Sequence, residues 1–296
     1  MLRKLTYSFL ALCLSVTFFA CSNNNNKETA ADGAKDAAAS GDLRIVSLSG
    51  PVSEALASLG LEQNIVGVDV TSTYPESLNK VTKVGNTHNL NIEAILALKP
   101  TYVISMKERG INPEQATQLQ QAGVKVWVIE QEYSIEGTKK YIGMLADSFG
   151  KKEAGQKLAA EIDSSFQTLP KYDTKPSILF IYARGAGALS VCGRDMPMSK
   201  MIDLAGGTNA AADIEGFKPV TAEALIKQNP DGILLFTSGL ASVDGPEGML
   251  KVPGVAATKA GKNKNFIVMD GELLAGFGPR VVLAIKELGE KIHKAQ

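Results

Sequence analysis

Short apolar runs and helical patterns alternate through the first half of the chain. Residues 44–49 alternate apolar and polar positions as a half-buried strand does, and residues 92–98 repeat apolar positions at helical spacing until Pro100. The same patterns predict strands at 44–49, 65–70, 102–105 and 125–129, and helices at 52–59, 92–98 and 113–122. Strands separated by helices indicate a parallel sheet with helices on both faces.

The pattern becomes purely helical from Ile135 onward. Apolar side chains share one face up to Phe149, Gly150 interrupts them, a second helical stretch continues to Phe166, and a new set of strands and helices starts at 178–183. We therefore predict an α/β fold of two lobes, each with a mainly parallel sheet flanked by helices, joined by one long α-helix. The predicted division is an N-terminal lobe at 42–150, a connecting helix at 151–170 and a C-terminal lobe at 171–296.

An internal repeat supports two lobes. The glutamate, alanine and apolar positions of residues 90–96 recur in residues 220–226, and the proline and apolar positions of 100–104 recur in 230–234 in the same register. A short helix followed by proline and a strand is common in α/β proteins, so chance similarity is the alternative. One gapless register across both segments favours a duplication.

The N-terminus is typical of a secretory signal. A short basic region precedes an apolar run at 5–20 that is short for a membrane span, so we predict a signal peptide at 1–20. The junction at 18–21 resembles a bacterial lipoprotein cleavage site, which predicts lipidation of Cys21 and, from the polar residues that follow, a disordered tether at 21–41. The mature chain would then be exported and lipid-anchored, at the periplasmic face of a membrane or at the cell surface. An ordinary signal peptide is the alternative.

Composition and charge exclude some classes of partner. The 296 residues are 45% hydrophobic and 21% charged, which is ordinary for a globular protein. Thirty-one basic residues balance thirty-one acidic ones, so no global field favours nucleic acid or an anionic membrane surface. We expect no nucleic-acid partner, and membrane contact through the N-terminal lipid only. Outside the predicted signal and lipid site the one cysteine is Cys192, so the folded part can form no internal disulfide.

A tyrosine in a polar loop is the main candidate for ligand chemistry. Tyr74 follows the apolar run at 65–70, and Pro75 disfavours a helical conformation for it. Its ring should project from the end of a strand, which is where open α/β sheets bind ligands. A tyrosine phenol has an ordinary pKa of about 10, so it needs a metal or a nearby cation to ionise at neutral pH.

Several short motifs occur together in this chain. They are 71–75, 84–85, 90–100, 204–209, 216–219, 222–224, 239–242, 253–255 and 276–280. Together they resemble the haem-binding proteins of bacterial haem ABC importers, and the resemblance extends over nearly all of 44–292. It implies a two-lobed binding protein that holds haem in the cleft between its lobes and delivers it to a permease dimer with its ATPase subunits. It also implies that Tyr74 is an axial ligand of the haem iron, since tyrosine ligation of haem is a known mode.

Three other side chains are candidates for contact with haem. His88 precedes the helix predicted at 92–98, where it could bind a propionate, hydrogen-bond the tyrosinate or ligate iron. Arg184 follows the strand predicted at 178–183, where some relatives carry a histidine ligand, and propionate binding is its natural role. Arg280 stands at a helix start and is a further candidate cation of the cleft, with an ordinary surface arginine as the alternative.

Two glutamates occupy equivalent places in the internal repeat. Glu93 and Glu223 each lie near the start of a predicted helix, where each alone would be explained by the helix dipole. As a pair they match the glutamates by which related binding proteins dock onto arginines of their permease. The resemblance therefore implies one docking carboxylate on each lobe.

The same residues bear on other possible functions. A zinc or manganese importer needs several converging His and acidic ligands, which one interior histidine cannot supply. A binding protein for a corrinoid or a ferric siderophore is the main alternative, because lobe architecture does not determine the ligand. A chelatase-like enzyme lacks any nucleophile or metal motif here, so we expect no enzymatic activity. A tethered structural lipoprotein without ligand is the last alternative.

Overall fold

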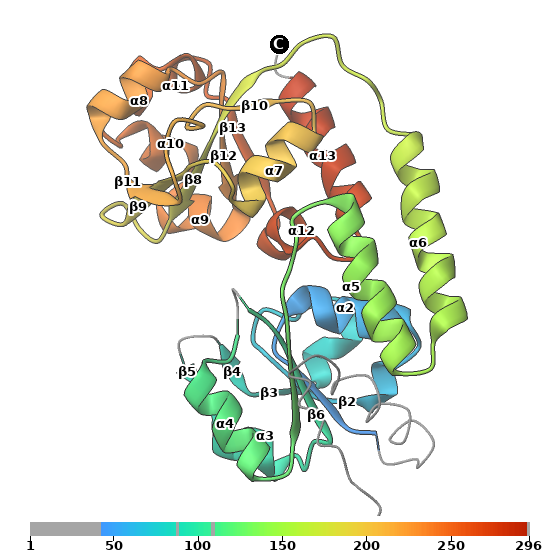
Figure 1. The fold of residues 1–296 in the computed structure, drawn as a ribbon. Helices are drawn as coiled ribbons and strands as arrows, with labels where there is room; N and C mark the ends of the chain where they lie inside the picture. Colours follow the sequence, from blue (N-terminus) through green and yellow to red (C-terminus); the bar gives the residue numbers. More distant parts are fainter. Residues whose placement is uncertain (1–42, 87–88, 108–109, 295–296) are drawn as a thin grey trace, which may run out of the picture.

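The computed structural model describes residues 43–86, 89–107 and 110–294, which form two lobes with long helices beside them (Figure 1). The predicted signal peptide, the lipid site at Cys21, most of the segment before the first strand and His88 lie outside the described residues. Within the described residues, no helix is both long enough and apolar enough to cross a membrane.

The N-terminal lobe is built on a five-stranded sheet in the order β3-β2-β1-β6-β7, in which every pairing is parallel. Its strands are β1 (Ile45–Ser47), β2 (Ile65–Val68), β3 (Thr82–Lys83), β6 (Tyr102–Met106) and β7 (Lys125–Ile129), with a small antiparallel pair of β4 (Gly85–Asn86) and β5 (Asn89–Leu90). Its helices are α2 (Gly50–Ser58), α3 (Ile92–Ala97), α4 (Pro113–Gln121) and α5 (Ile135–Ser148), with 3-10 turns at Glu62–Asn64 and Glu76–Lys80. The parallel sheet predicted from the alternation of apolar runs and helices is confirmed.

The C-terminal lobe has a six-stranded sheet in the order β11-β9-β8-β12-β13, with β10 also paired to β8. Its strands are β8 (Ser177–Ala183), β9 (Leu189–Cys192), β10 (Thr208–Asn209), β11 (Phe217–Pro219), β12 (Gly232–Phe236) and β13 (Phe266–Met269). Its helices are α7 (Pro197–Leu204), α8 (Ala222–Gln228), α9 (Thr237–Ser242), α10 (Gly245–Leu250), α11 (Lys259–Lys262), α12 (Gly271–Gly276) and α13 (Val281–Lys294), with a 3-10 turn at Val255–Ala257. Strands β8, β10, β12 and β13 are parallel, whereas β9 and β11 pair antiparallel at one edge, so this sheet is mainly parallel as predicted.

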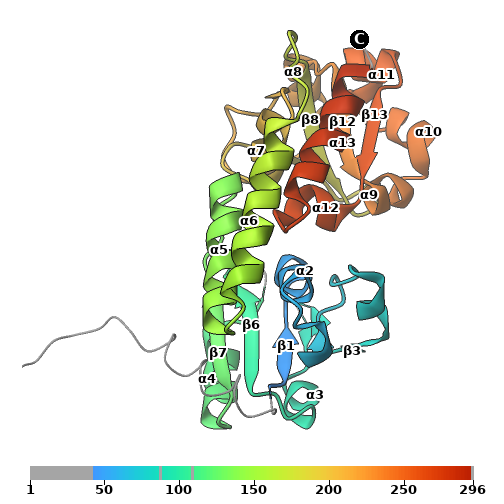
Figure 2. The ribbon, with the colours of Figure 1, turned by 90° about the vertical axis from the view of Figure 1, so that its right-hand side faces the viewer.

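Helix α6 (Lys152–Gln167) lies within the range expected for the connecting helix and runs beside both lobes (Figure 2). It packs against α5 at a close approach made by a glycine, because a Cβ at Gly155 would lie 2.4 Å from the Cβ of Ala146. Its buried apolar position is Ile162. It also packs against α13 of the C-terminal lobe, so it connects the two lobes along one side (Figure 2).

Local signals explain where the helices begin. The side chain of Asn112 accepts a hydrogen bond from the backbone N–H of Gln115, whose own side chain accepts one from the backbone of Asn112, and Pro113 follows at the first helical position of α4. Such caps satisfy backbone donors that have no partner inside the helix. The boundaries of these short helices are therefore encoded locally.

One cluster of buried apolar side chains includes residues of both lobes. It contains Leu56 and Phe149 of the N-terminal lobe, Phe180 and Leu288 of the C-terminal lobe, and Phe277 from the segment after α12. Each lobe also has a smaller cluster on the other face of its sheet. The lobes are thus not two independent cores joined by a tether, because apolar packing continues between them.

Candidate functional site

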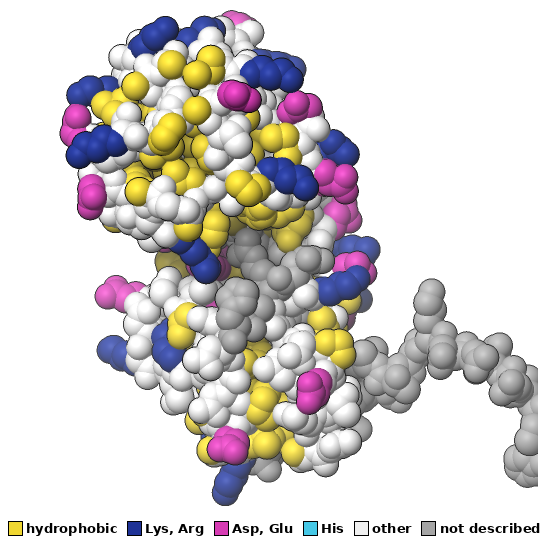
Figure 3. Space-filling view, turned by 90° about the vertical axis from the view of Figure 1, so that its left-hand side faces the viewer, with side chains coloured by type: hydrophobic (Ala, Val, Ile, Leu, Met, Phe, Trp, Pro, Cys, Tyr) yellow, Lys and Arg dark blue, Asp and Glu magenta, His cyan; other side chains and the backbone are white. Residues whose placement is uncertain are grey.

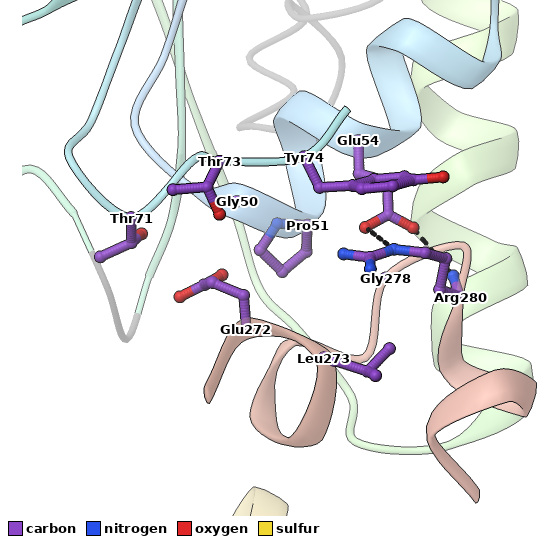
Figure 4. A pocket seen from close by; sticks show the side chains of 10 residues that line it. All are labelled: Gly50, Pro51, Glu54, Thr71, Thr73, Tyr74, Glu272, Leu273, Gly278 and Arg280. Carbon is purple, nitrogen blue, oxygen red and sulfur yellow. Dashed lines mark hydrogen bonds and ion pairs between the residues drawn. The ribbon is translucent and has the colours of Figure 1, made fainter. Parts of the chain in front are cut away.

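A pocket lies where the two lobes face each other (Figure 4). The N-terminal lobe contributes the start of α2 and the loop after β2, and the C-terminal lobe contributes α12 and the segment leading to α13. The lining residues are Gly50, Pro51, Glu54, Thr71, Thr73, Tyr74, Glu272, Leu273, Gly278 and Arg280. The structure therefore brings together Tyr74 and Arg280, two of the residues singled out from the sequence.

Tyr74 lies in the loop that follows β2, at the carboxyl end of the parallel strands, as its place in the sequence predicts. Its side chain is 47% exposed, which is unusual for a large aromatic residue and leaves its ring accessible. Figure 4 shows the ring lying flat above the guanidinium of Arg280. The contact places the aromatic ring of Tyr74 and the guanidinium of Arg280 side by side in the pocket.

A buried polar network holds the start of the tyrosine loop. The carboxylate of Asp69 accepts hydrogen bonds from the hydroxyls of Thr71 and Ser72 and from the backbone N–H of Thr71, the last at 3.1 Å. The hydroxyl of Ser72 lies 2.9 Å from that of Ser53 in α2, and Lys83 Nζ donates to the carbonyl of Ser72 at 2.6 Å. Since buried polar groups that are fully bonded rigidify their surroundings, the loop that carries the tyrosine is held on three sides.

Arg280 reaches from the C-terminal part of the chain to the N-terminal lobe. Its Nε donates to Oε2 of Glu54 at 2.9 Å, and its backbone N–H donates to Oε1 of the same carboxylate at 2.9 Å. Burial raises the pKa of the Glu54 carboxyl, and the charge and hydrogen bonds of Arg280 partly offset that effect. The guanidinium carbon lies 3.6 Å from the centroid of the Tyr74 ring, which is close for a cation–π contact.

The residues before Arg280 are anchored in the N-terminal lobe. The carbonyl of Phe277 accepts hydrogen bonds from the hydroxyls of Thr138, at 3.0 Å, and Tyr141, at 3.3 Å, and Gln131 Nε2 donates to the carbonyl of Gly276 at 2.7 Å. The side chain of Phe277 is fully buried, and its φ of 51° is rare for a bulky residue. Such a conformation persists only where the surroundings impose it, so the position of Arg280 is determined by both lobes.

Arg184 lies elsewhere on the C-terminal lobe. It follows β8, is exposed, and donates from Nε to the hydroxyl of Tyr182 at 2.7 Å, with its guanidinium 5.2 Å from the centre of that ring. It does not belong to the lining of the pocket around Tyr74. The structure thus separates it from Arg280, and its role as a propionate-binding group stays a prediction.

Glu93 and Glu223 are both exposed in the first turn of a short helix, one in each lobe. The helices are capped in the same way, since the side chain of Asn91 accepts from the N–H of Ala94 and that of Thr221 accepts from the N–H of Ala224. The local geometry of the repeat is therefore the same in both lobes. A docking role for these carboxylates stays a prediction.

Sequence reasoning missed the residues that position the site. The helix predicted at 52–59 contains Glu54, to which the sequence assigned no partner, whereas the structure pairs this residue with Arg280. Sequence reasoning also made no use of Asp69, whose place next to a Thr-Ser pair is the kind of signal that favours local hydrogen bonding. In the described part of the chain, no group of three or more His, Cys, Asp or Glu side chains is arranged to hold a metal ion.

Comparison with protein families and known proteins gives consistent matches. The model of the family described as periplasmic binding protein matches residues 45–273. The chain is 30% identical over 258 residues to the uncharacterized ABC transporter substrate-binding lipoprotein YvrC of Bacillus subtilis, covering 84% of this chain and 80% of that protein. It is also 30% identical over 198 residues to the vitamin B12-binding protein of Vibrio campbellii, covering 66% of this chain and 70% of that protein.

Solved structures match over most of the chain. The periplasmic heme-binding protein RhuT from Roseiflexus sp. RS-1 superposes with a TM-score of 0.82 and 36% sequence identity, covering 86% of this chain and 99% of that one. The periplasmic heme-binding protein BhuT, in complex with two hemes, superposes with a TM-score of 0.80 and 30% identity, covering 85% and 98%. These proteins are named for what they bind and not for a reaction, in agreement with the expectation that the chain is no enzyme.

Proposed function

We propose that this chain, which belongs to the periplasmic binding protein family, captures ferric haem in the cleft between its lobes and delivers it to an ABC permease. The family makes it a binding component and not an enzyme. The haem-binding proteins among the matched structures support the choice of ligand. Haem is the cargo here, and its iron would be bound only while it is carried.

The observation that carries the proposal is the position of Tyr74. Its ring is exposed in the interlobe pocket and lies over the guanidinium of Arg280, 3.6 Å from the guanidinium carbon. The cation–π contact holds the ring in the pocket, and a phenolate oxygen is a hard ligand that suits ferric iron. Tyr74 would therefore be the axial ligand, as the sequence resemblance implies.

The three candidate haem contacts take different roles in this proposal. Arg280 is already bonded to Glu54, so we assign it to the tyrosinate and not to a propionate. Arg184 is exposed on the other lobe and is the candidate for a propionate, because a guanidinium suits carboxylates. His88 keeps its proposed role as a contact of the propionate or the tyrosinate, although it lies outside the described residues.

Two further features support delivery of haem to a permease. Glu93 and Glu223 stand at equivalent, exposed places of the two lobes, which suits a permease with two identical subunits. Lipidation of Cys21 and the tether at 21–41 would keep the protein beside that permease, and the lipoprotein name of the Bacillus subtilis relative supports the anchor. The export signal, the anchor and the transport of iron with haem belong to this proposal.

A second candidate ligand is a corrinoid, since one relative is named as a vitamin B12-binding protein. The test is absorption titration of the purified mature protein with haemin and, in separate experiments, with cyanocobalamin and a ferric siderophore. We expect saturable binding of haemin and a charge-transfer band typical of tyrosinate-bound ferric iron. Binding of cobalamin or the siderophore in preference to haemin would refute the proposal.

A further inference from the structure

A row of aromatic rings crosses the C-terminal lobe from its core to its surface. The ring of Phe180 is fully buried and lies 4.9 Å from that of Phe236, which lies 6.0 Å from that of Tyr182, and Tyr182 lies 5.9 Å from Phe217 (distances between ring centroids). Phe217 ends the row and is 42% exposed. Neighbouring rings are inclined by 53° to 83°, so the row ends in the exposed ring of Phe217, which the edges and faces of the rings behind it support from the core.

Strand register explains why these rings share one face. Tyr182 of β8 pairs with Ser190 of β9, and Ser190 pairs with Pro219 of β11. Phe217 is two residues before Pro219 in the same strand, so its side chain points to the same side of the sheet as that of Tyr182. We call Phe217, Tyr182 and Phe236 the aromatic shelf.

The aromatic shelf is continuous with the pocket that holds Tyr74. A Cβ placed on Gly271 would lie 3.6 Å from the ring of Phe236, so that ring packs against the start of α12. The next residues of α12, Glu272 and Leu273, line the pocket. Figure 3 shows hydrophobic side chains of the upper lobe gathered above the hollow between the lobes. The shelf therefore adjoins the start of α12, whose next residues line the pocket between the lobes.

We propose that the aromatic shelf contacts the face of the porphyrin that is turned away from Tyr74, through the exposed ring of Phe217 with the rings of Tyr182 and Phe236 behind it, and that it selects flat macrocycles whether or not they hold iron. This inference rests on the proposed function. Aromatic rings attract one another through offset or edge contacts, and these contacts need no metal. Tyr74 supplies affinity for the iron, whereas the shelf supplies affinity for the ring system. A corrin, which carries side chains above and below its plane, fits such a surface poorly.

Arg184 contacts one ring of the shelf, that of Tyr182. Its Nε donates to the hydroxyl of Tyr182 at 2.7 Å, which restrains the phenol at the exposed edge of the row. One of the five donors of the guanidinium is used by this bond, and the side chain is exposed. A propionate at the edge of a stacked porphyrin would meet this cation.

The test is equilibrium titration of the mature full-length protein with two probes, haemin and metal-free protoporphyrin. Phe217→Ala should weaken binding of both probes by a similar factor of about threefold to tenfold, because it removes a stacking ring. Tyr74→Ala should weaken binding of haemin alone. Phe166→Ala, on α6, is the matched control, because Phe166 is 39% exposed and outside the pocket. Equal binding of metal-free protoporphyrin by Phe217→Ala and Phe166→Ala would refute the proposed role of the aromatic shelf in binding the porphyrin.

Variants at Tyr182 separate the ring from its hydroxyl. Tyr182→Phe keeps the ring and should bind metal-free protoporphyrin as the wild type does, whereas Tyr182→Leu should lose affinity about threefold or more. Equal losses in both would assign the effect to the hydroxyl and overturn the stacking role. A wild-type protein that binds metal-free protoporphyrin through Phe217 but not haemin would support the shelf and overturn the proposed function.

Discussion

The guanidinium carbon of Arg280 lies 3.6 Å from the centroid of the Tyr74 ring, although the two residues belong to opposite ends of the folded chain. Arg280 is held in that place by Glu54 of α2, and Tyr74 by the network around Asp69. The contact therefore joins a guanidinium that is held by an ion pair to a ring whose loop is anchored at its start. Such preorganisation would lower the cost of binding the ligand that we propose for Tyr74.

Tyr74→Ala should lose more than about a hundredfold in affinity for haemin, because removal of the partners behind a metal ligand alone costs ten- to a hundredfold. Tyr74→Phe should behave nearly as badly, since it lacks the phenolate oxygen. The residue is 47% exposed, so the free energy of unfolding should change by less than about 0.5 kcal/mol. Absorption titration and thermal unfolding measure the two effects. Unchanged haemin binding and an unchanged charge-transfer band in both variants would exclude Tyr74 as the ligand.

Glu54→Gln should change how stability depends on pH. Burial raises the pKa of the Glu54 carboxyl above its ordinary value, so the folded state binds this proton more tightly than the unfolded chain. The stability that this group contributes is complete below the ordinary pKa of 4.5 and is lost as the pH rises through the raised value. The variant has no carboxyl to titrate, so its free energy of unfolding should fall less than that of the wild type over this range.

Denaturant unfolding of the two proteins at a series of pH values from about 4.5 upward measures the difference. At neutral pH the variant also leaves Arg280 without its counter-charge, which should cost about 1–3 kcal/mol. Parallel pH profiles for the wild type and Glu54→Gln would show that the carboxyl does not titrate in this window. Asp147→Asn, on α5, is a control for the loss of one carboxyl.

The variant His293→Phe should lose less stability at acid pH than the wild type does. The imidazole stacks on the ring of Tyr172 with centroids 3.7 Å apart, and burial lowers its pKa below the ordinary 6.5. The unfolded chain then binds the proton more readily, so stability is present above pH 6.5 and is lost as the pH falls through the lowered pKa. Phenylalanine keeps the stacked ring but cannot titrate.

Thermal unfolding from about pH 7.5 to pH 5 tests this expectation. The melting temperature of the wild type should fall more steeply below pH 6.5 than that of His293→Phe. The hydroxyl of Thr174 lies 3.2 Å from Nδ1 of the imidazole, so Thr174→Val serves as a control for the lost hydrogen bond without the lost charge. A steeper acid loss in His293→Phe than in the wild type would contradict the assignment.

Local patterns in the sequence predicted four strands of the N-terminal sheet, the starts of α3 and α4 and the place of Tyr74 after β2, because each depends on neighbouring residues. The loop after β2 contains its own signal, a proline beside a tyrosine at the end of an apolar run. The pairing of Glu54 with Arg280 could not be predicted, since nothing near either residue indicates the other. The aromatic shelf was missed for the same reason, as Tyr182 and Phe217 meet only through the register of three strands.

The repeat of the two lobes extends to the ends of the helices that carry Glu93 and Glu223. Helix α3 is followed by Lys99 with a φ of 48°, and α8 by Asn229 with a φ of 42°, and a proline follows each of them. A residue in this left-handed conformation ends a helix abruptly. The two helices therefore have similar N-caps, a glutamate in the first turn and similar C-terminal ends. Each lobe thus places its carboxylate at the same position relative to the start of its helix.

We expect the double variant Glu93→Lys, Glu223→Lys to bind haemin as the wild type does but to abolish stimulation of ATP hydrolysis by the transporter, and uptake with it. Both carboxylates are exposed and lie outside the lining of the pocket around Tyr74, so the ligand site should be unaffected. Reversal of charge on a docking surface replaces attraction by repulsion at both permease subunits, and each single change should give a partial defect. Glu114→Lys, Glu153→Lys is the matched control, because these exposed glutamates also lie in the first turn of a helix, and reversal there costs a similar 0.3–1 kcal/mol of helix-dipole energy. Normal uptake by the first pair, or an equal defect in the control pair, would refute the docking role.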